Sequence, residues 1–163
     1  MENFIKLMLA FGIGLLLVLL AMPKVIPFLH KMKFGQVERE EGLESHKKKG
    51  GTPTMGGVVF VLAAVIAAFV VNYKNITNPN LILITIVLVG YSLIGFIDDA
   101  LIILKHQNEG LKAWQKFLMQ AILAVGCYLY LENFVPGFTT EVTIPIVKVN
   151  IDFGWFYAVL VFI

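Results

Sequence analysis

The sequence predicts an all-α polytopic membrane protein that carries a small external β-hairpin. Of its 163 residues, 58% are hydrophobic and only 15% are charged, whereas about a quarter of the residues in soluble domains are charged. Several apolar stretches without charges approach the length that a helix needs to cross roughly 30 Å of hydrocarbon. The net charge is only +2, so the chain lacks the basic character of nucleic-acid-binding proteins, and we expect no nucleic-acid partner.

Four stretches are predicted to be complete transmembrane helices, because each is apolar over nearly the whole length that a bilayer requires. A fifth stretch, 153–163, would span only about 16 Å at 1.5 Å per residue, which is half of the hydrocarbon core. We therefore expect residues 1–163 to form a single membrane domain that is the N-terminal piece of a longer protein. The complete spans are about 4–23, 56–73, 81–104 and 117–135.

The distribution of basic residues predicts the orientation of these helices. The segments 24–55 and 105–116 together hold ten of the 13 lysines and arginines. The positive-inside rule makes both segments cytoplasmic and places the N-terminus outside. A cleaved signal peptide at the N-terminus is disfavoured, because it would send the basic segment 24–55 outward.

Residues 136–152 follow a different pattern, which favours strands. Val142, Ile144 and Ile146 recur at every second position, and a period of two is typical of a β-strand with two unlike faces. Pro145 favours an edge or a turn, because proline cannot donate to a sheet ladder. We predict a short β-hairpin on the outer surface.

The strongest chemical signal is the carboxylate pair Asp98 and Asp99 near the cytoplasmic end of the third span. An aspartate at mid-bilayer costs about 2.5 to 3.5 kcal/mol on insertion scales and less near the interface, so the pair calls for a reason. Lys105 returns to nearly the helix face of Asp98, about 10 Å further along the axis. Carboxylate and ammonium groups at this spacing suit a divalent metal that bridges a diphosphate. The alternative is that all three residues only mark the end of the helix at the membrane surface.

A glycine-rich loop with three lysines and two threonines precedes the second span. Its charges and hydroxyls, those of Lys49 and Thr54 among them, suit a phosphate-bearing ligand. The loop lacks the Gly-Lys-Ser/Thr of a P-loop, and a polybasic patch that touches anionic lipids is the alternative interpretation. Lys112, Lys116 and Gln120 repeat every four residues and are predicted to face the same cytoplasmic mouth. The histidines and Cys127 have no metal-ligand spacing, and Cys127 is interpreted as a small packing residue.

Three motifs in this order and spacing resemble those of phospho-N-acetylmuramoyl-pentapeptide transferase, the bacterial family called MraY. The resemblance covers residues 1–163, and the combination of its first two motifs is specific. The motifs are Lys-Gly-Gly-Thr-Pro-Thr-Met-Gly-Gly at 49–57, Gly-Phe-Ile-Asp-Asp at 95–99, and Asn-Glu-Gly-Leu at 108–111 followed by Gln115 and Lys116.

The resemblance implies a ten-helix, multi-pass enzyme of the bacterial plasma membrane, dimeric and dependent on Mg²⁺, with its active site on the cytoplasmic side. Such an enzyme transfers phospho-MurNAc-pentapeptide from UDP-MurNAc-pentapeptide to undecaprenyl phosphate. The products are UMP and lipid I, an intermediate of peptidoglycan synthesis, so the implied processes are cell-wall biogenesis, cell shape and cell division.

The resemblance also implies roles for individual residues. Asp98 and Asp99 would be the catalytic carboxylates and the candidate Mg²⁺ ligands, with one of the two near the ion and the other a candidate base toward the lipid phosphate. The residues implied to contact the nucleotide and the phosphates are Lys49, Thr54 and Lys116. Many family members have a lysine where this chain has Ile102, and Lys105 is the candidate that replaces its charge.

The family's third essential aspartate and its histidine-rich loop would lie past Ile163, so residues 1–163 alone are expected to be inactive. Three alternatives remain open. The chain could belong to another polyprenyl-phosphate sugar-1-phosphate transferase, to a transporter that relays a cation through its aspartates, or to a membrane scaffold that binds anionic lipid.

Overall fold

Helices occupy most of the apolar stretches in the computed structural model, which describes residues 1–31, 55–105, 110–144 and 149–162. Three of the helices in these ranges, α1, α4 and α5, are long and apolar enough to cross a membrane. The chain divides into two compact units, 1–76 with 92–112, and 77–91 with 113–163. The elements in chain order are α1 (Glu2–Lys31), α3 (Gly57–Val71), the 3₁₀ helix η1 (Tyr73–Asn75), α4 (Pro79–Lys105), α5 (Ala113–Phe134), β1 (Glu141–Ile144), β2 (Val149–Asp152), the 3₁₀ helix η2 (Gly154–Phe156) and α6 (Tyr157–Phe162).

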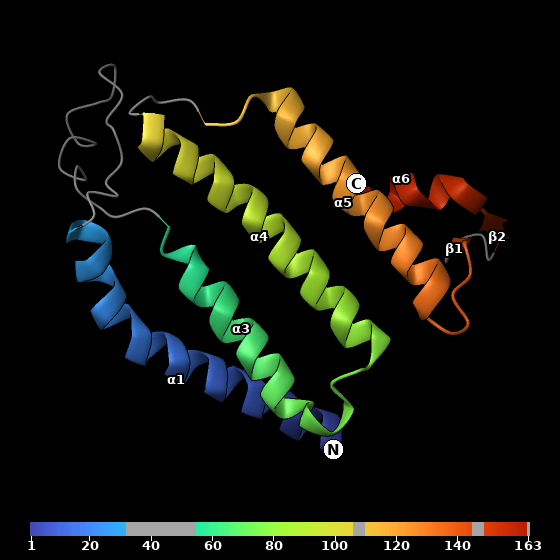
Figure 1. The fold of residues 1–163 in the computed structure, drawn as a ribbon. Helices are drawn as coiled ribbons and strands as arrows, with labels where there is room; N and C mark the ends of the chain where they lie inside the picture. Colours follow the sequence, from blue (N-terminus) through green and yellow to red (C-terminus); the bar gives the residue numbers. More distant parts are fainter. Residues whose placement is uncertain (32–54, 106–109, 145–148, 163) are drawn as a thin grey trace. The chain divides into compact units, whose positions relative to one another are not determined.

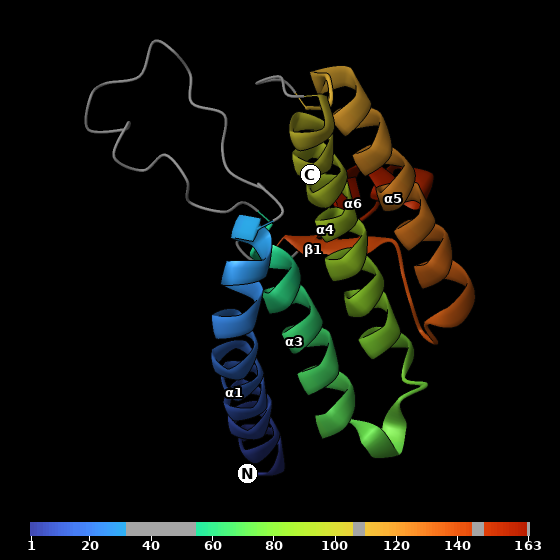
Figure 2. The ribbon, with the colours of Figure 1, turned by 60° about the vertical axis from the view of Figure 1, so that its left-hand side comes forward.

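In the first unit, α1 and α3 lie side by side and antiparallel (Figures 1 and 2). Small residues let the two backbones come close, as is common between membrane helices. A Cβ atom at Gly14 would lie 3.9 Å from the Cβ of Ala67, and one at Gly56 would lie 3.7 Å from Cε of Met22. Ala67 is only 3% exposed. These contacts place the C-terminal half of α1 beside the start of α3.

The first helix is longer than the predicted span, because it continues past Pro23 to Lys31 and so includes the start of the predicted loop 24–55. Two prolines, Pro23 and Pro27, lie inside it. Their spacing of one turn puts both missing N–H groups on the same face, which limits the lost hydrogen bonds to that face. Leu29, two residues after Pro27, is buried.

The second predicted span forms a helix, α3, that is shorter than the predicted range 56–73. It has 15 residues, or about 22 Å at 1.5 Å per residue. Asn72 ends it, since both its backbone N–H and its side-chain amide donate to the carbonyl of Ala68, at 3.1 and 2.8 Å. This cap uses carbonyl capacity that the end of a helix leaves unpaired.

The third predicted span forms helix α4, and the start of this helix follows the usual rules for helix capping. The side-chain oxygen of Asn78 accepts hydrogen bonds from the N–H groups of Asn80, at 2.9 Å, and Leu81, at 3.4 Å. Pro79 occupies the first helical position, where its missing N–H costs nothing. The helix then runs to Lys105 without interruption.

In the second unit, α4 and α5 come close at Gly90. A Cβ atom there would lie 2.6 Å from Cδ1 of Leu123, so only glycine fits without displacing that side chain. Cys127 on α5 is 2% exposed, in keeping with its interpretation as a packing residue. Tyr128 and Tyr157 both contact the ring of Phe138 edge to face, with centroids 6.3 and 5.3 Å apart. Phe138 therefore links α5 to α6.

The predicted β-hairpin is confirmed. The strands β1 and β2 pair antiparallel, with Glu141 opposite Asp152 and Ile144 opposite Val149. All four residues of β2 are exposed. The predicted role of Pro145 falls outside the residues that the structure describes.

Candidate functional site

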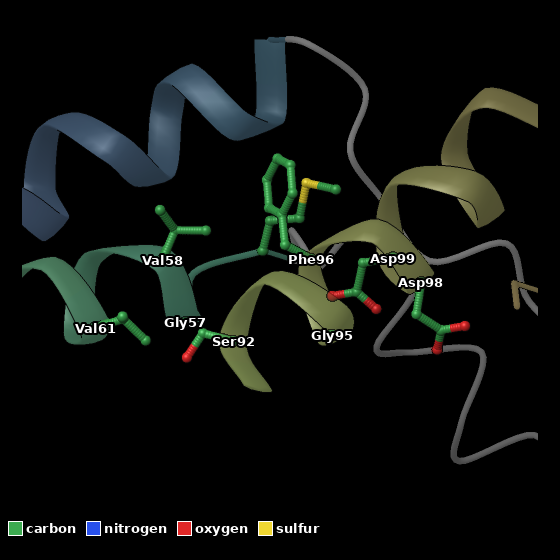
Figure 3. A pocket seen from close by; sticks show the side chains of 9 residues that line it. Gly57, Val58, Val61, Ser92, Gly95, Phe96, Asp98 and Asp99 are labelled. Atoms are coloured by element: carbon green, nitrogen blue, oxygen red, sulfur yellow. The ribbon is translucent and has the colours of Figure 1, made fainter. Parts of the chain in front are cut away.

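A pocket of about 310 Å³ lies in the first unit, between the start of α3 and the C-terminal half of α4 (Figure 3). The start of α3 supplies one wall, which is apolar, and α4 supplies the other. Asp98 and Asp99 belong to the α4 wall, and both are half-buried. The lining residues are Met55, Gly57, Val58, Val61, Ser92, Gly95, Phe96, Asp98 and Asp99.

The α4 wall is largely one face of the helix. Ser92, Gly95, Phe96 and Asp99 are spaced i, i+3, i+4 and i+7, which places them on a single stripe. Asp98 is one position away, so it is turned by about 100°. Figure 3 shows the two carboxylates directed differently, as the sequence predicts. Two adjacent aspartates therefore line one pocket, and their carboxylates point in different directions.

Asp98 is held by the chain that follows α4. The backbone N–H of Leu111 donates a hydrogen bond of 2.7 Å to Oδ1 of Asp98. Gly110 makes this approach possible, because a Cβ atom there would overlap Oδ1 and lie 2.7 Å from the carbonyl oxygen of Asp98. Sequence reasoning did not identify this contact, although Gly110 belongs to the motif at 108–111. A backbone N–H group that binds a side chain cannot be recognised from the sequence, so Gly110 was the only available signal for this contact.

The α3 wall begins with an unusual backbone conformation. Met55 has φ of +68°, in the left-handed region that costs a side-chain-bearing residue about 1 to 2 kcal/mol. The turn leads directly into the first turn of α3, where the N–H groups of Val58 and Val59 donate to the carbonyls of Met55 and Gly56. The start of a helix carries partial positive charge. This wall can therefore favour an anion, while the facing wall supplies carboxylates.

The other predicted site residues lie in different places. Lys105 is exposed at the C-terminal end of α4, and Lys116 is half-buried in the first turn of α5, in the second unit. Lys116 thus belongs to a helix, although the sequence predicted a loop over 105–116. Lys49 and Thr54 lie outside the described residues.

The donor chemistry of the pocket fits a hard cation. Mg²⁺ is bound in proteins through one or two carboxylates, with waters and substrate phosphates as its remaining ligands. Asp98 and Asp99 supply carboxylates of that kind at one pocket. Within the described ranges, no group of three or more His, Cys, Asp or Glu side chains could hold a metal.

The apolar wall of the pocket coincides with a known family signature. Residues 49–61 match the model described as phospho-N-acetylmuramoyl-pentapeptide-transferase signature 1. Four residues of that segment, Met55, Gly57, Val58 and Val61, line the pocket opposite the aspartates. The signature and the carboxylate pair therefore meet at one site.

Similar proteins carry the same description along most of the chain. A phospho-N-acetylmuramoyl-pentapeptide-transferase of Halalkalibacterium halodurans is 41% identical over 96% of this chain and 48% of its own length. Proteins of the same name from Bacillus subtilis and Staphylococcus epidermidis are 41% and 42% identical over 91% of this chain, and 45% and 47% of their own lengths. The chain thus spans about half the length of the curated relatives it matches. The signature and the identity along nearly the whole chain show that it belongs to the phospho-N-acetylmuramoyl-pentapeptide transferase family.

Proposed function

We propose that the chain contributes to a bacterial plasma-membrane enzyme that transfers phospho-MurNAc-pentapeptide from UDP-MurNAc-pentapeptide to undecaprenyl phosphate. The products would be UMP and lipid I for peptidoglycan synthesis. One observation carries the proposal: the family signature at Met55 to Val61 and the carboxylates of Asp98 and Asp99 form opposite walls of the same pocket.

The residues around the pocket suit phosphoryl transfer. We propose that Asp98 and Asp99 hold Mg²⁺, which when bound would offset charge on the diphosphate of the donor. The start of α3 would favour the phosphate through its backbone N–H groups and helix dipole. The apolar residues Val58 and Val61 would exclude water beside the reacting groups, which strengthens electrostatic interactions there.

Four further residues are proposed to contact the nucleotide or the phosphates. Lys49 and Thr54 belong to the signature segment 49–61, whose later residues line the pocket. Lys105 follows Asp98 on the same helix by about two turns. Lys116, in the first turn of α5, is the fourth of these proposed contacts.

The proposed arrangement in the membrane has the N-terminus outside and the segments 24–55 and 105–116 on the cytoplasmic side. In this arrangement α3 is the second of four complete spans, and residues 153–163 begin a fifth. At about 22 Å, α3 is short for a typical bilayer, and local thinning of the membrane accommodates such helices. We also propose that the whole enzyme is a homodimer.

Substitution of the two aspartates tests the catalytic site. Asp98→Asn and Asp99→Asn keep the size of each side chain but remove its charge, so each should lower the rate of transfer about a hundredfold or more. The measurement is formation of lipid I from UDP-MurNAc-pentapeptide and undecaprenyl phosphate by the full-length protein. A titration with Mg²⁺ should also show weaker apparent binding in both variants.

Glu132→Gln is the matched control, because Glu132 is an exposed carboxylate in the last turns of α5. This variant should transfer at the rate of the wild-type protein. Wild-type rates in both aspartate variants would refute the catalytic assignment of the pair. Absence of lipid I formation by the wild-type protein would refute the proposed transfer and favour a scaffold or transporter.

A further inference from the structure

We propose that Gly110 and the backbone N–H of Leu111 are positioning elements for Asp98, so that the chain after α4 sets the direction of one catalytic carboxylate. This inference deepens the proposed function and rests on it. Leu111 donates to Oδ1 of Asp98 at 2.7 Å, across thirteen residues of sequence, and the bond is partly shielded from water. A hydrogen bond from an N–H group to a carboxylate is among the stronger ones in proteins.

The geometry at Gly110 explains why this position carries no side chain. A Cβ atom would overlap Oδ1 of Asp98, and it would lie 2.8 Å from Cγ and 2.7 Å from the carbonyl oxygen. The carboxylate could rotate away, but the carbonyl oxygen is part of the α4 backbone and cannot move cheaply. Any side chain at position 110 must therefore push the chain away from Asp98 and break the bond from Leu111.

The backbone angles at position 110 do not require glycine. Among the glycines that the structure describes, Gly137 and Gly154 have φ of +76° and +49°, in the left-handed region, whereas Gly110 does not. Alanine would therefore be tolerated at 110 if only the turn mattered. The need for glycine comes from the close approach to Asp98.

The bond matters for catalysis because α4 alone does not fix the aspartate. The face of Ser92, Gly95 and Asp99 turns toward α3, whereas Asp98 lies about 100° away from Asp99 around the helix. Asp98 lines the same pocket, its carboxylate is directed differently from that of Asp99 (Figure 3), and the Leu111 N–H fixes one of its oxygens. A carboxylate displaced by about 1 Å can lose much of its effect on a reaction rate.

Two substitutions in the full-length protein test the inference. Gly110→Ala removes the close approach. Replacing Leu111 with the corresponding α-hydroxy acid exchanges only its N–H for an ester oxygen, without added bulk. Each should lower kcat for lipid I formation about 10- to 100-fold, the effect of losing one hydrogen bond to a charged group. KM for UDP-MurNAc-pentapeptide should stay within about twofold, because the nucleotide contacts are retained.

Gly126→Ala is the matched control, because a Cβ atom at Gly126 meets nothing within 4 Å. Its kcat should equal that of the wild-type protein. Thermal unfolding in detergent checks that the variants fold. A double-mutant cycle with Asp98→Asn separates positioning from a purely structural role: in the Asp98→Asn background, Gly110→Ala should lower the residual rate by less than twofold.

The possible outcomes separate this inference from the function on which it rests. If the wild-type full-length protein forms no lipid I, the proposed function itself is refuted. If Asp98→Asn leaves transfer unchanged, the catalytic role of Asp98 and the positioning inference are both overturned, while the transfer itself stands. If Asp98→Asn abolishes transfer while Gly110→Ala and the ester both keep wild-type kcat, only the positioning inference is overturned. A loss in Gly110→Ala without a loss in the ester also overturns it, because bulk rather than the Leu111 N–H would then be responsible.

Discussion

Asp152 shows at the scale of a residue how one carboxylate secures the end of the hairpin. Its Oδ1 accepts a hydrogen bond from the hydroxyl of Thr140 and another, of 2.9 Å, from the N–H of Gly154. Both donors favour the ionised form, so they lower the pKa of Asp152 below its ordinary value of 3.8. The N–H of Phe153 also donates to the carbonyl of Thr140, at 3.1 Å. The residues around Asp152 thus tie the strand to the turn that follows.

The lowered pKa predicts that the end of the hairpin loosens in acid. Because the pKa of Asp152 is lower in the folded chain than in the unfolded one, its contribution to stability is present above pH 3.8 and is lost as the pH falls through the folded value. The amide resonance of Gly154, followed by NMR during acidification, should report this change. Asp152→Asn should remove the transition, whereas Glu141→Gln, on the residue opposite in the register, should retain it. The same transition in Asp152→Asn would contradict the assignment.

Candidate site residues could be predicted from the sequence where a charged side chain lies in an apolar, membrane-spanning stretch, because burial of such a charge is costly. Asp98 and Asp99 are charged groups in an apolar stretch, so the sequence indicated them as candidates, and both line one pocket. The hydrogen bond from Leu111 could not be predicted, because its donor is a backbone N–H thirteen residues away. The roles proposed for Lys49, Thr54, Lys105 and Lys116 remain predictions.

At the scale of elements, close contact between α1 and α3 shapes the first unit. Gly14 on α1 faces Ala67 on α3, and Ala63 and Ala67 are 4% and 3% exposed. Between helices in lipid, such small residues increase van der Waals contact, because there is little hydrophobic gain from association. The contact places the signature segment of α3 against a long helix and so supports the pocket wall.

Two glycines of α1 provide a test of this contact. A Cβ atom at Gly14 would lie 3.9 Å from Ala67, which is an ordinary contact, whereas one at Gly12 would meet nothing within 4 Å. Gly14→Leu should therefore destabilise the protein by about 1 to 3 kcal/mol through overpacking, whereas Gly14→Ala should be tolerated. Thermal unfolding in detergent measures the difference, with Gly12→Leu as the matched control. Equal stability of Gly12→Leu and Gly14→Leu would show that α1 and α3 do not pack in this way.

Elements were predictable where the pattern is local. Hydropathy located α4 and α5 to within a few residues, and alternation located the hairpin, because each pattern depends on neighbours in the sequence. The extent of α1 was not predictable, since prolines such as Pro23 and Pro27 usually end or kink a helix. Here the helix continues to Lys31 and buries Leu29. Packing therefore overrode the local preference.

At the scale of the whole molecule, the topology of the first unit bears on orientation in the membrane. The C-terminal half of α1, the start of α3 and the pocket with its aspartates are joined by contacts at one end, through Met22 and Gly56. Because α1 and α3 are antiparallel, the 3₁₀ helix that follows α3 and the N-terminus of α1 lie at the same end of the helix pair (Figures 1 and 2). If the basic segments are cytoplasmic, the pocket lies toward the side of the membrane on which the proposed nucleotide donor and lipid phosphate would meet.

Two exposed lysines at opposite ends of this helix pair test that orientation. Lys31 ends α1, and Lys74 lies in the 3₁₀ helix after α3. In right-side-out vesicles, a membrane-impermeant maleimide should label Lys74→Cys in the full-length protein but should not label Lys31→Cys. Inverted vesicles should give the reverse result. The native Cys127 is 2% exposed, so Cys127→Ala is a suitable background. Labelling of both cysteines from the same side would contradict α3 as a complete span. The reverse pattern would place the aspartates outside, where no cytoplasmic nucleotide donor could reach them.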